Sequence, residues 1–111
     1  MGKIKLYSLS KRAEMQYRTG ARQAKNIPID VLRRKISALI YASRDRFYFS
    51  PEDATIIFGT CVITFGANQV TDIRWCNDNH GSGICKKEKN ALLEAYTYFG
   101  MDKNGTYLVS N

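Results

Sequence analysis

The run ATIIFGTCVITF at residues 54–65 constrains the fold more than any other part of the chain. Most of its residues are β-branched or aromatic, which are the types that favour extended strands. We expect one long strand over this run, in which Gly59 marks a bulge or a close packing contact. Residues 66–69 then form a turn, and residues 70–75 alternate as a return strand. The sequence therefore predicts an antiparallel meander at the centre of the fold.

Two helices are expected on either side of this meander. Residues 28–44 begin with Pro28 and Asp30, which suit a first helical turn, and apolar residues follow at helical spacing. Residues 84–99 carry a similar apolar stripe and end before Gly100, which suits a left-handed C-cap. Both stripes are expected to face the core.

The length of the chain fits one domain. Its 111 residues, of which 44% are hydrophobic, are enough for a core without disulfides or metal. Further short strands are expected at residues 3–9, 46–49 and 106–109. We therefore predict an α+β fold over residues 1–111: an antiparallel sheet of three to five strands, packed by helices at about 28–44 and 84–99, with a basic N-terminal segment.

Residues 1–26 form this basic N-terminal segment. Ser10 suits the N-cap of a helix over residues 11–25, whereas Gly20 lies in the middle of that helix and weakens it. The segment is either a surface helix or a flexible arm that becomes ordered on a partner. Its cationic residues are Lys11, Arg12, Arg18, Arg22 and Lys25.

Positive charge is concentrated in the first part of the chain. Residues 1–46 contain 12 Lys and Arg against 3 Asp and Glu, a net charge of +9, whereas residues 47–111 contain 5 against 7, a net charge of −2. Such a basic region attracts polyanions with a salt-dependent affinity. The partners expected are nucleic acid or an acidic protein surface; the alternative is a solvated surface that only raises solubility.

The stretch CNDNHGSGICKKEKN at residues 76–90 contains the only histidine and two of the three cysteines. Cys76, His80 and Cys85 offer three metal ligands, but a structural zinc takes four, and the usual C-x2-C pair is absent. The single histidine excludes a two-histidine nuclease mechanism, and a Cys–His pair here lacks an orienting group. We expect no cofactor, no metal and no enzyme activity; structural zinc at these three residues is the alternative.

A glycine-rich turn precedes the helix expected at 84–99. Gly81, Ser82 and Gly83 let backbone amides approach an anion at the positive end of the helix. Three lysines follow in the first turns, where they oppose the helix dipole: Lys86, Lys87 and Lys89. An anion bound at this point is one reason for such a placement. The alternative is that the lysines extend into water.

The run GSGICKKEKNALLEA at residues 81–95 resembles the last segment of double-stranded RNA-binding domains. In that family a glycine-containing turn leads into a helix that opens with Lys-Lys-x-x-Lys. The order of helix, strands and helix over about residues 28–99 is similar to the family's α-β-β-β-α plan. The resemblance implies that the three lysines contact phosphates across a major groove. Lys89 comes one position early, and Asn90 stands where the family has its third lysine.

These patterns together predict a non-catalytic nucleic-acid-binding protein, with RNA favoured over DNA. The expected contacts are Gly81, Ser82, Gly83, Lys86, Lys87, Lys89, Arg33, Arg34, Lys35, Lys11, Arg12, Arg18, Arg22 and Lys25. The alternative is a small interaction or inhibitor protein, for example a phage-encoded one, that docks on a host protein or nucleoprotein complex. We find no secretory signal, no membrane-spanning run, no evident small-molecule substrate and no indication of oligomeric state, so a cytoplasmic location is expected.

Overall fold

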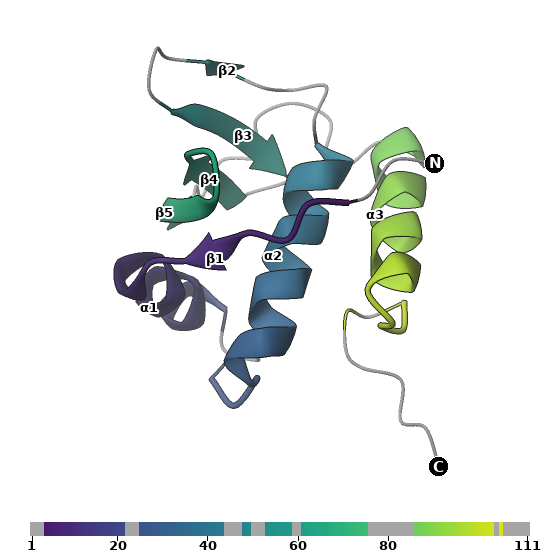
Figure 1. The fold of residues 1–111 in the computed structure, drawn as a ribbon, viewed down its shortest axis with the longest axis horizontal. Helices are drawn as coiled ribbons and strands as arrows, with labels where there is room; N and C mark the ends of the chain where they lie inside the picture. The colour runs from purple at the N-terminus through teal and green to yellow at the C-terminus, as the bar shows by residue number, and fades with distance from the viewer. Residues whose placement is uncertain are drawn as a thin grey trace.

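A computed structural model describes residues 4–21, 25–43, 48–49, 53–58, 61–75, 86–103 and 105. These residues form three helices and one five-stranded sheet (Figure 1). The predicted α+β class is therefore confirmed. In chain order the elements are β1 (Ser8–Leu9), α1 (Lys11–Gly20), α2 (Ile29–Ala42), β2 (Tyr48–Phe49), β3 (Ala54–Phe58), β4 (Cys61–Phe65), β5 (Gln69–Trp75) and α3 (Lys86–Tyr98).

The sheet is mixed, so the prediction of a purely antiparallel sheet is wrong. Its strand order is β1-β5-β4-β3-β2, and the strands from β2 to β5 are antiparallel neighbours. The strand β1 instead runs parallel to β5, with Ser8 opposite Gln69 and Leu9 opposite Val70. Parallel neighbours need a long crossover. Here the connection between β1 and β5 contains two helices and three strands, which gives ample length.

The apolar run at 54–65 forms two strands where we expected one. The strands β3 and β4 pair antiparallel, with Ile56 opposite Ile63 and Phe58 opposite Cys61, so the chain reverses between them. The reversal changes which residues share a face: Cys61, Ile63 and Phe65 are buried, while Val62 and Thr64 are half-buried on the other face. Gly59, for which we expected a bulge or a close contact, lies outside the described residues.

A β-bulge separates the two halves of the pairing between β4 and β5. Thr64 is opposite Asp72, but Phe65 is opposite Val70, so β5 carries one extra residue, Thr71. The bulge lets Val70 and Ile73 both point into the core although they are three positions apart. Trp75 is the last residue of this strand.

The core lies between the sheet and the helices α1 and α2. Buried residues from both helices and from β3, β4 and β5 form one cluster, which includes Tyr17, Leu32, Ile36, Ile56 and Ile63. The helix α3 packs mainly against α2, so that α2 lies between the sheet and α3 (Figure 1). A second cluster joins α2 and α3 through Val31, Ala38, Ala95, Tyr96 and Met101, with Ile4 of the N-terminal segment.

The helices agree closely with the sequence predictions at 28–44 and 84–99. The helix α3 ends as predicted: Gly100 has a φ of 75°, and Met101 donates a backbone hydrogen bond of 2.8 Å to Tyr96 O. Met101 is buried, which provides the hydrophobic contact that accompanies this kind of cap. The strand predicted at 106–109 lies outside the described residues. No helix in the described ranges is long and apolar enough to cross a membrane.

Two buried tyrosines make the stability of this core sensitive to alkaline pH. Burial raises the pKa of Tyr17, with smaller contributions from Cys61 and Tyr96. Burial also raises the pKa of Tyr96 to about 12, with a smaller contribution from Asp102. In the unfolded chain both phenols ionise near pH 10, so above this pH the unfolded state binds fewer protons than the folded state. The free energy of unfolding is therefore expected to fall between about pH 10 and 12.

The expected slope for two such groups reaches about 2.7 kcal/mol per pH unit. Urea denaturation at several pH values from 9 to about 11.5 measures it. The double variant Tyr17→Phe/Tyr96→Phe should show a much smaller loss of stability over the same pH range. An equal loss in the variant and the natural chain would contradict this assignment.

Candidate nucleic-acid interface

Most of the predicted contact residues that the structure describes lie on three helices, and these do not form one surface. The helices α2 and α3 run antiparallel, because Tyr41 Oη lies 3.3 Å from Glu94 Oε1 while Lys35, earlier in α2, lies beside Gly105. The lysines at the start of α3 therefore lie near the end of α2, away from α1 (Figure 1). Several predicted contact residues lie outside the described residues: Gly81, Ser82, Gly83 and Arg22.

The predicted cations of α2 are half-buried. Arg33 Nε donates a hydrogen bond of 3.2 Å to Tyr7 O, which ties α2 to the N-terminal segment. Burial lowers the pKa of Lys35, and the nearby Asp102 opposes this effect. Arg34 is half-buried as well. Arg33 and Lys35 thus contribute to packing within the fold.

The lysines of α3 face solvent. Lys86, Lys87 and Lys89 are exposed, and Glu88 between them is buried. This placement fits both of the alternatives from the sequence, a phosphate contact and a solvated surface. The turn that would complete an anion site precedes Lys86 and lies outside the described residues.

The helix α1 is folded against the sheet and presents two different sides. Ala13 and Tyr17 are buried in the core. On one side, Arg18 forms an ion pair of 2.9 Å with Glu14 and lies 3.3 Å from Lys25 O, so its charge is used within the fold. The other side of α1 is open and lines a groove.

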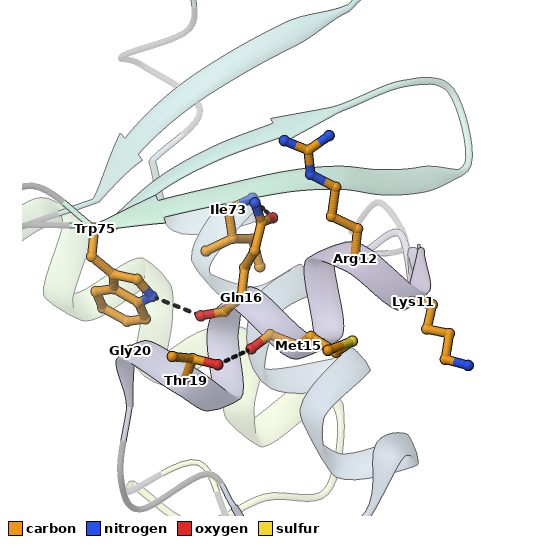
Figure 2. Close-up of a pocket in the computed structure, with 8 residues that line it drawn as sticks. All are labelled: Lys11, Arg12, Met15, Gln16, Thr19, Gly20, Ile73 and Trp75. Atoms are coloured by element: carbon orange, nitrogen blue, oxygen red, sulfur yellow. Dashed lines mark hydrogen bonds between the residues drawn. The ribbon is translucent and has the colours of Figure 1, made fainter.

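This groove, the α1–β5 groove, lies between α1 and the end of β5 and has a volume of about 690 Å³ (Figure 2). Its lining combines cations at the start of α1 with apolar side chains further along. The lining residues are Lys11, Arg12, Met15, Gln16, Thr19, Gly20, Ile73 and Trp75. Two of its large apolar side chains remain accessible, since Met15 is 61% and Trp75 is 38% exposed.

The position of α1 follows from the short length of β1. Among the described residues β1 pairs only with Gln69 and Val70, which leaves the rest of that edge of β5 without a strand partner. Ser10 directly follows β1. It is the N-cap of α1, because its Oγ accepts a hydrogen bond from Ala13 N at 3.0 Å. The chain therefore turns into a helix at the point where β5 continues, and α1 covers the open edge.

The side chain of Gln16 closes this open edge. Its Oε1 accepts a hydrogen bond from Ile73 N at 2.9 Å, and its Nε2 donates one of 3.0 Å to Asp72 Oδ1. The Ile73 N–H would otherwise be a backbone donor in a buried position. A single glutamine thus substitutes for the missing strand and fixes the distance between α1 and β5.

The indole of Trp75 is held in one orientation by α1. Its Nε1–H donates a hydrogen bond of 3.2 Å to Gln16 O, and its ring centroid lies 5.4 Å from that of Tyr17. The ring also packs against Gly20, where an added Cβ would lie only 2.0 Å from Nε1. We expected Gly20 to weaken the middle of a helix; instead α1 ends at Gly20, and the absent side chain makes room for the indole.

Two arginine side chains lie close to the carboxylate of Asp72 beside the groove. Arg74 Nε lies 3.0 Å from Asp72 Oδ2, and Arg12 Nη2 lies 3.5 Å from Asp72 Oδ1. The side chains of Arg12 and Arg74 are 72% and 75% exposed, so each guanidinium keeps free donors toward solvent. Two arginines, Arg12 and Arg74, thus flank one carboxylate. The groove thus has an aromatic end at Trp75 and a positive end at Arg12.

The sequence identified only part of this site. Lys11 and Arg12 were predicted contacts, whereas Trp75, Met15 and Arg74 were missed. The available signal was that Trp75 is the only tryptophan and shares a strand face with Ile73. It was not sufficient, because the groove forms only when α1 docks on β5.

A comparison with protein-family models, with curated proteins and with solved structures finds no match for this chain. The resemblance to double-stranded RNA-binding domains therefore stays a prediction. In the described parts of the chain, no three His, Cys, Asp or Glu side chains are grouped so as to hold a metal ion. Cys76, His80 and Cys85 lie outside those parts, so the structural-zinc alternative also stays a prediction.

Proposed function

We propose that this protein binds nucleic acid through the α1–β5 groove and does so without catalysis. The observation that carries the proposal is the exposed indole of Trp75 in a groove whose other end holds Lys11 and Arg12. Proteins that bind nucleic acid combine aromatic side chains, on which bases stack, with cations that contact phosphates. RNA is favoured over DNA because RNA is recognised mainly through unpaired, accessible bases.

The distribution of charge supports the same surface. Most of the net positive charge belongs to residues 1–46, and two of the four exposed cations in the described part of this region, Lys11 and Arg12, lie on α1; the other two are Lys5 and Lys25. Arg74 adds a further exposed cation from β5. A polyanion would approach this side of the molecule first, because unlike charges attract over about a Debye length of 8–10 Å.

Fluorescence anisotropy with labelled oligonucleotides tests the proposal. Three phosphate contacts predict a slope of about −2 for the logarithm of the binding constant against that of the salt concentration, or about 15-fold weaker binding at about 200 mM than at about 50 mM salt. Single-stranded and duplex RNA and DNA are compared. Absence of binding to all four, or binding that salt does not change, would contradict the proposal.

A pair of charge-matched variants distinguishes the groove from the start of α3. Lys11→Gln/Arg12→Gln and Lys86→Gln/Lys89→Gln each remove two positive charges from exposed positions. The first variant is expected to bind about tenfold more weakly and to lose about 1.4 from the salt slope, whereas the second keeps the affinity within about threefold. The reverse order would place the contact at α3, as the family resemblance implies.

A protein partner is the second candidate. Exposed Trp and Met side chains beside Arg are also enriched at protein–protein interfaces, and the groove contains all three. Capture from lysate with and without nuclease treatment separates the candidates. A stoichiometric protein partner that survives nuclease would favour the interaction or inhibitor function over nucleic-acid binding.

A further inference from the structure

We infer that the α1–β5 groove takes an unpaired nucleobase of a single strand, which stacks on Trp75 while phosphates further along the same strand bind Arg12 and Lys11. The inference rests on the proposed function and adds the class of nucleic acid and the residue that selects it. The selecting residue is Trp75, because it is the aromatic side chain that lines the groove.

The size and the walls of the groove suit a base rather than a duplex surface. Its volume of about 690 Å³ falls within the roughly 300–1,000 Å³ of pockets that hold small organic molecules. Its walls near Trp75 are largely apolar and include Met15, Ile73 and the bare backbone of Gly20 (Figure 2). In a duplex both faces of a base are covered by its neighbours, so only an unpaired base can enter such a site.

The indole is prepared for stacking before any ligand arrives. The contact with Gly20 and the hydrogen bond to Gln16 O fix the ring, and Gln16 is itself anchored to Ile73 and Asp72. A ring that is already fixed loses little conformational entropy when a base stacks on it. A base would stack on the part of Trp75 that stays accessible, since 38% of the residue is exposed.

The positive end of the groove suits phosphate. Asp72 holds Arg12 near Arg74 without neutralising both, and the fork of donors on a guanidinium matches phosphate oxygens. Lys11 extends from the first residue of α1 and Gly20 is its last residue, so the helix separates the two ends by about 15 Å. A strand of several nucleotides reaches both ends, whereas a mononucleotide reaches only one.

Isothermal titration with four probes tests the inference. The probes are a single-stranded RNA of about 12 nucleotides, the same strand paired with its complement, the same strand with abasic sugars throughout, and a mixture of nucleoside monophosphates. The intact single strand is expected to bind about tenfold or more tightly than each of the other three. The abasic strand keeps every phosphate, so this comparison isolates stacking without any change to the protein.

Two variants of the protein complete the test. Trp75→Leu is expected to bind the single strand about tenfold more weakly, and Trp75→Phe, which keeps an aromatic ring, stays within about threefold. Equal binding of the abasic strand, the duplex or the mononucleotides to that of the intact strand would overturn the inference and leave nucleic-acid binding itself standing. Absence of binding to every probe would instead contradict the proposed function.

Discussion

Replacing Gly20 by alanine is expected to destabilise the fold and to disrupt the α1–β5 groove. A Cβ at position 20 would lie 2.0 Å from Nε1 and 2.2 Å from Cδ1 of Trp75, so the indole must move. In an ordinary helix the same substitution stabilises by roughly 0.5–1 kcal/mol. Here overpacking is expected to reverse the sign and to cost about 1–3 kcal/mol.

Thr19→Ala is the matched control for Gly20→Ala. Thr19 also lines the groove and directly precedes Gly20 in the chain. Its side chain donates a hydrogen bond of 2.8 Å to Met15 O within the same helix. Its replacement should change the free energy of unfolding by less than about 0.5 kcal/mol. Urea denaturation of both variants measures the difference. A Gly20→Ala variant more stable than the natural chain would show that the indole does not rest on Gly20.

Replacing Ile63 by alanine is expected to cost about 2–5 kcal/mol of folding stability. Ile63 lies in β4, is fully buried, and packs opposite Ile56 between the sheet and the helices. The alanine leaves a cavity in the part of the core to which α1 and α2 both contribute. Chemical denaturation of the variant gives the loss directly.

Val62→Ala is the control that turns this experiment into a test of the strand register. Val62 is the neighbour of Ile63, pairs with Ile57 and lies half-buried on the other face of the sheet. Its truncation is expected to cost about 1 kcal/mol or less. If residues 54–65 formed one continuous strand, Val62 would share a face with Ile56 and Phe58, and the two costs would be reversed.

The β hairpin was missed because Gly59 was interpreted as a bulge or close contact within one strand. Both halves of the 54–65 run are β-branched or aromatic, and the residues between Phe58 and Cys61 are Gly-Thr, which is also compatible with a two-residue type II′ hairpin turn but lacks the stronger Asn-Gly or Asp-Gly signal. The helices α2 and α3 were predicted well because each carries a long apolar stripe with recognisable ends. The parallel pairing of β1 was missed because two residues carry too little pattern to show a direction.

The charged residues illustrate what the sequence could not resolve about the site. The charge count places most cations in residues 1–46, but it cannot tell which of them bind within the fold. Arg18 pairs with Glu14, Arg33 bonds to Tyr7 O, and Lys35 is half-buried. Lys11 and Arg12 remain at the surface because α1 presents that side to the groove. Which cations bind within the fold and which stay at the surface therefore depends on tertiary packing.

The fluorescence of Trp75 tests the central claim most directly, because Trp75 is the only tryptophan in the chain and lies in the α1–β5 groove. Titration with a single-stranded RNA is expected to quench its emission to saturation, since the base stacks on the indole. The midpoint should move to higher RNA concentration with added salt and in Lys11→Gln/Arg12→Gln. Unchanged Trp75 emission while anisotropy reports that the same RNA is bound would contradict the account.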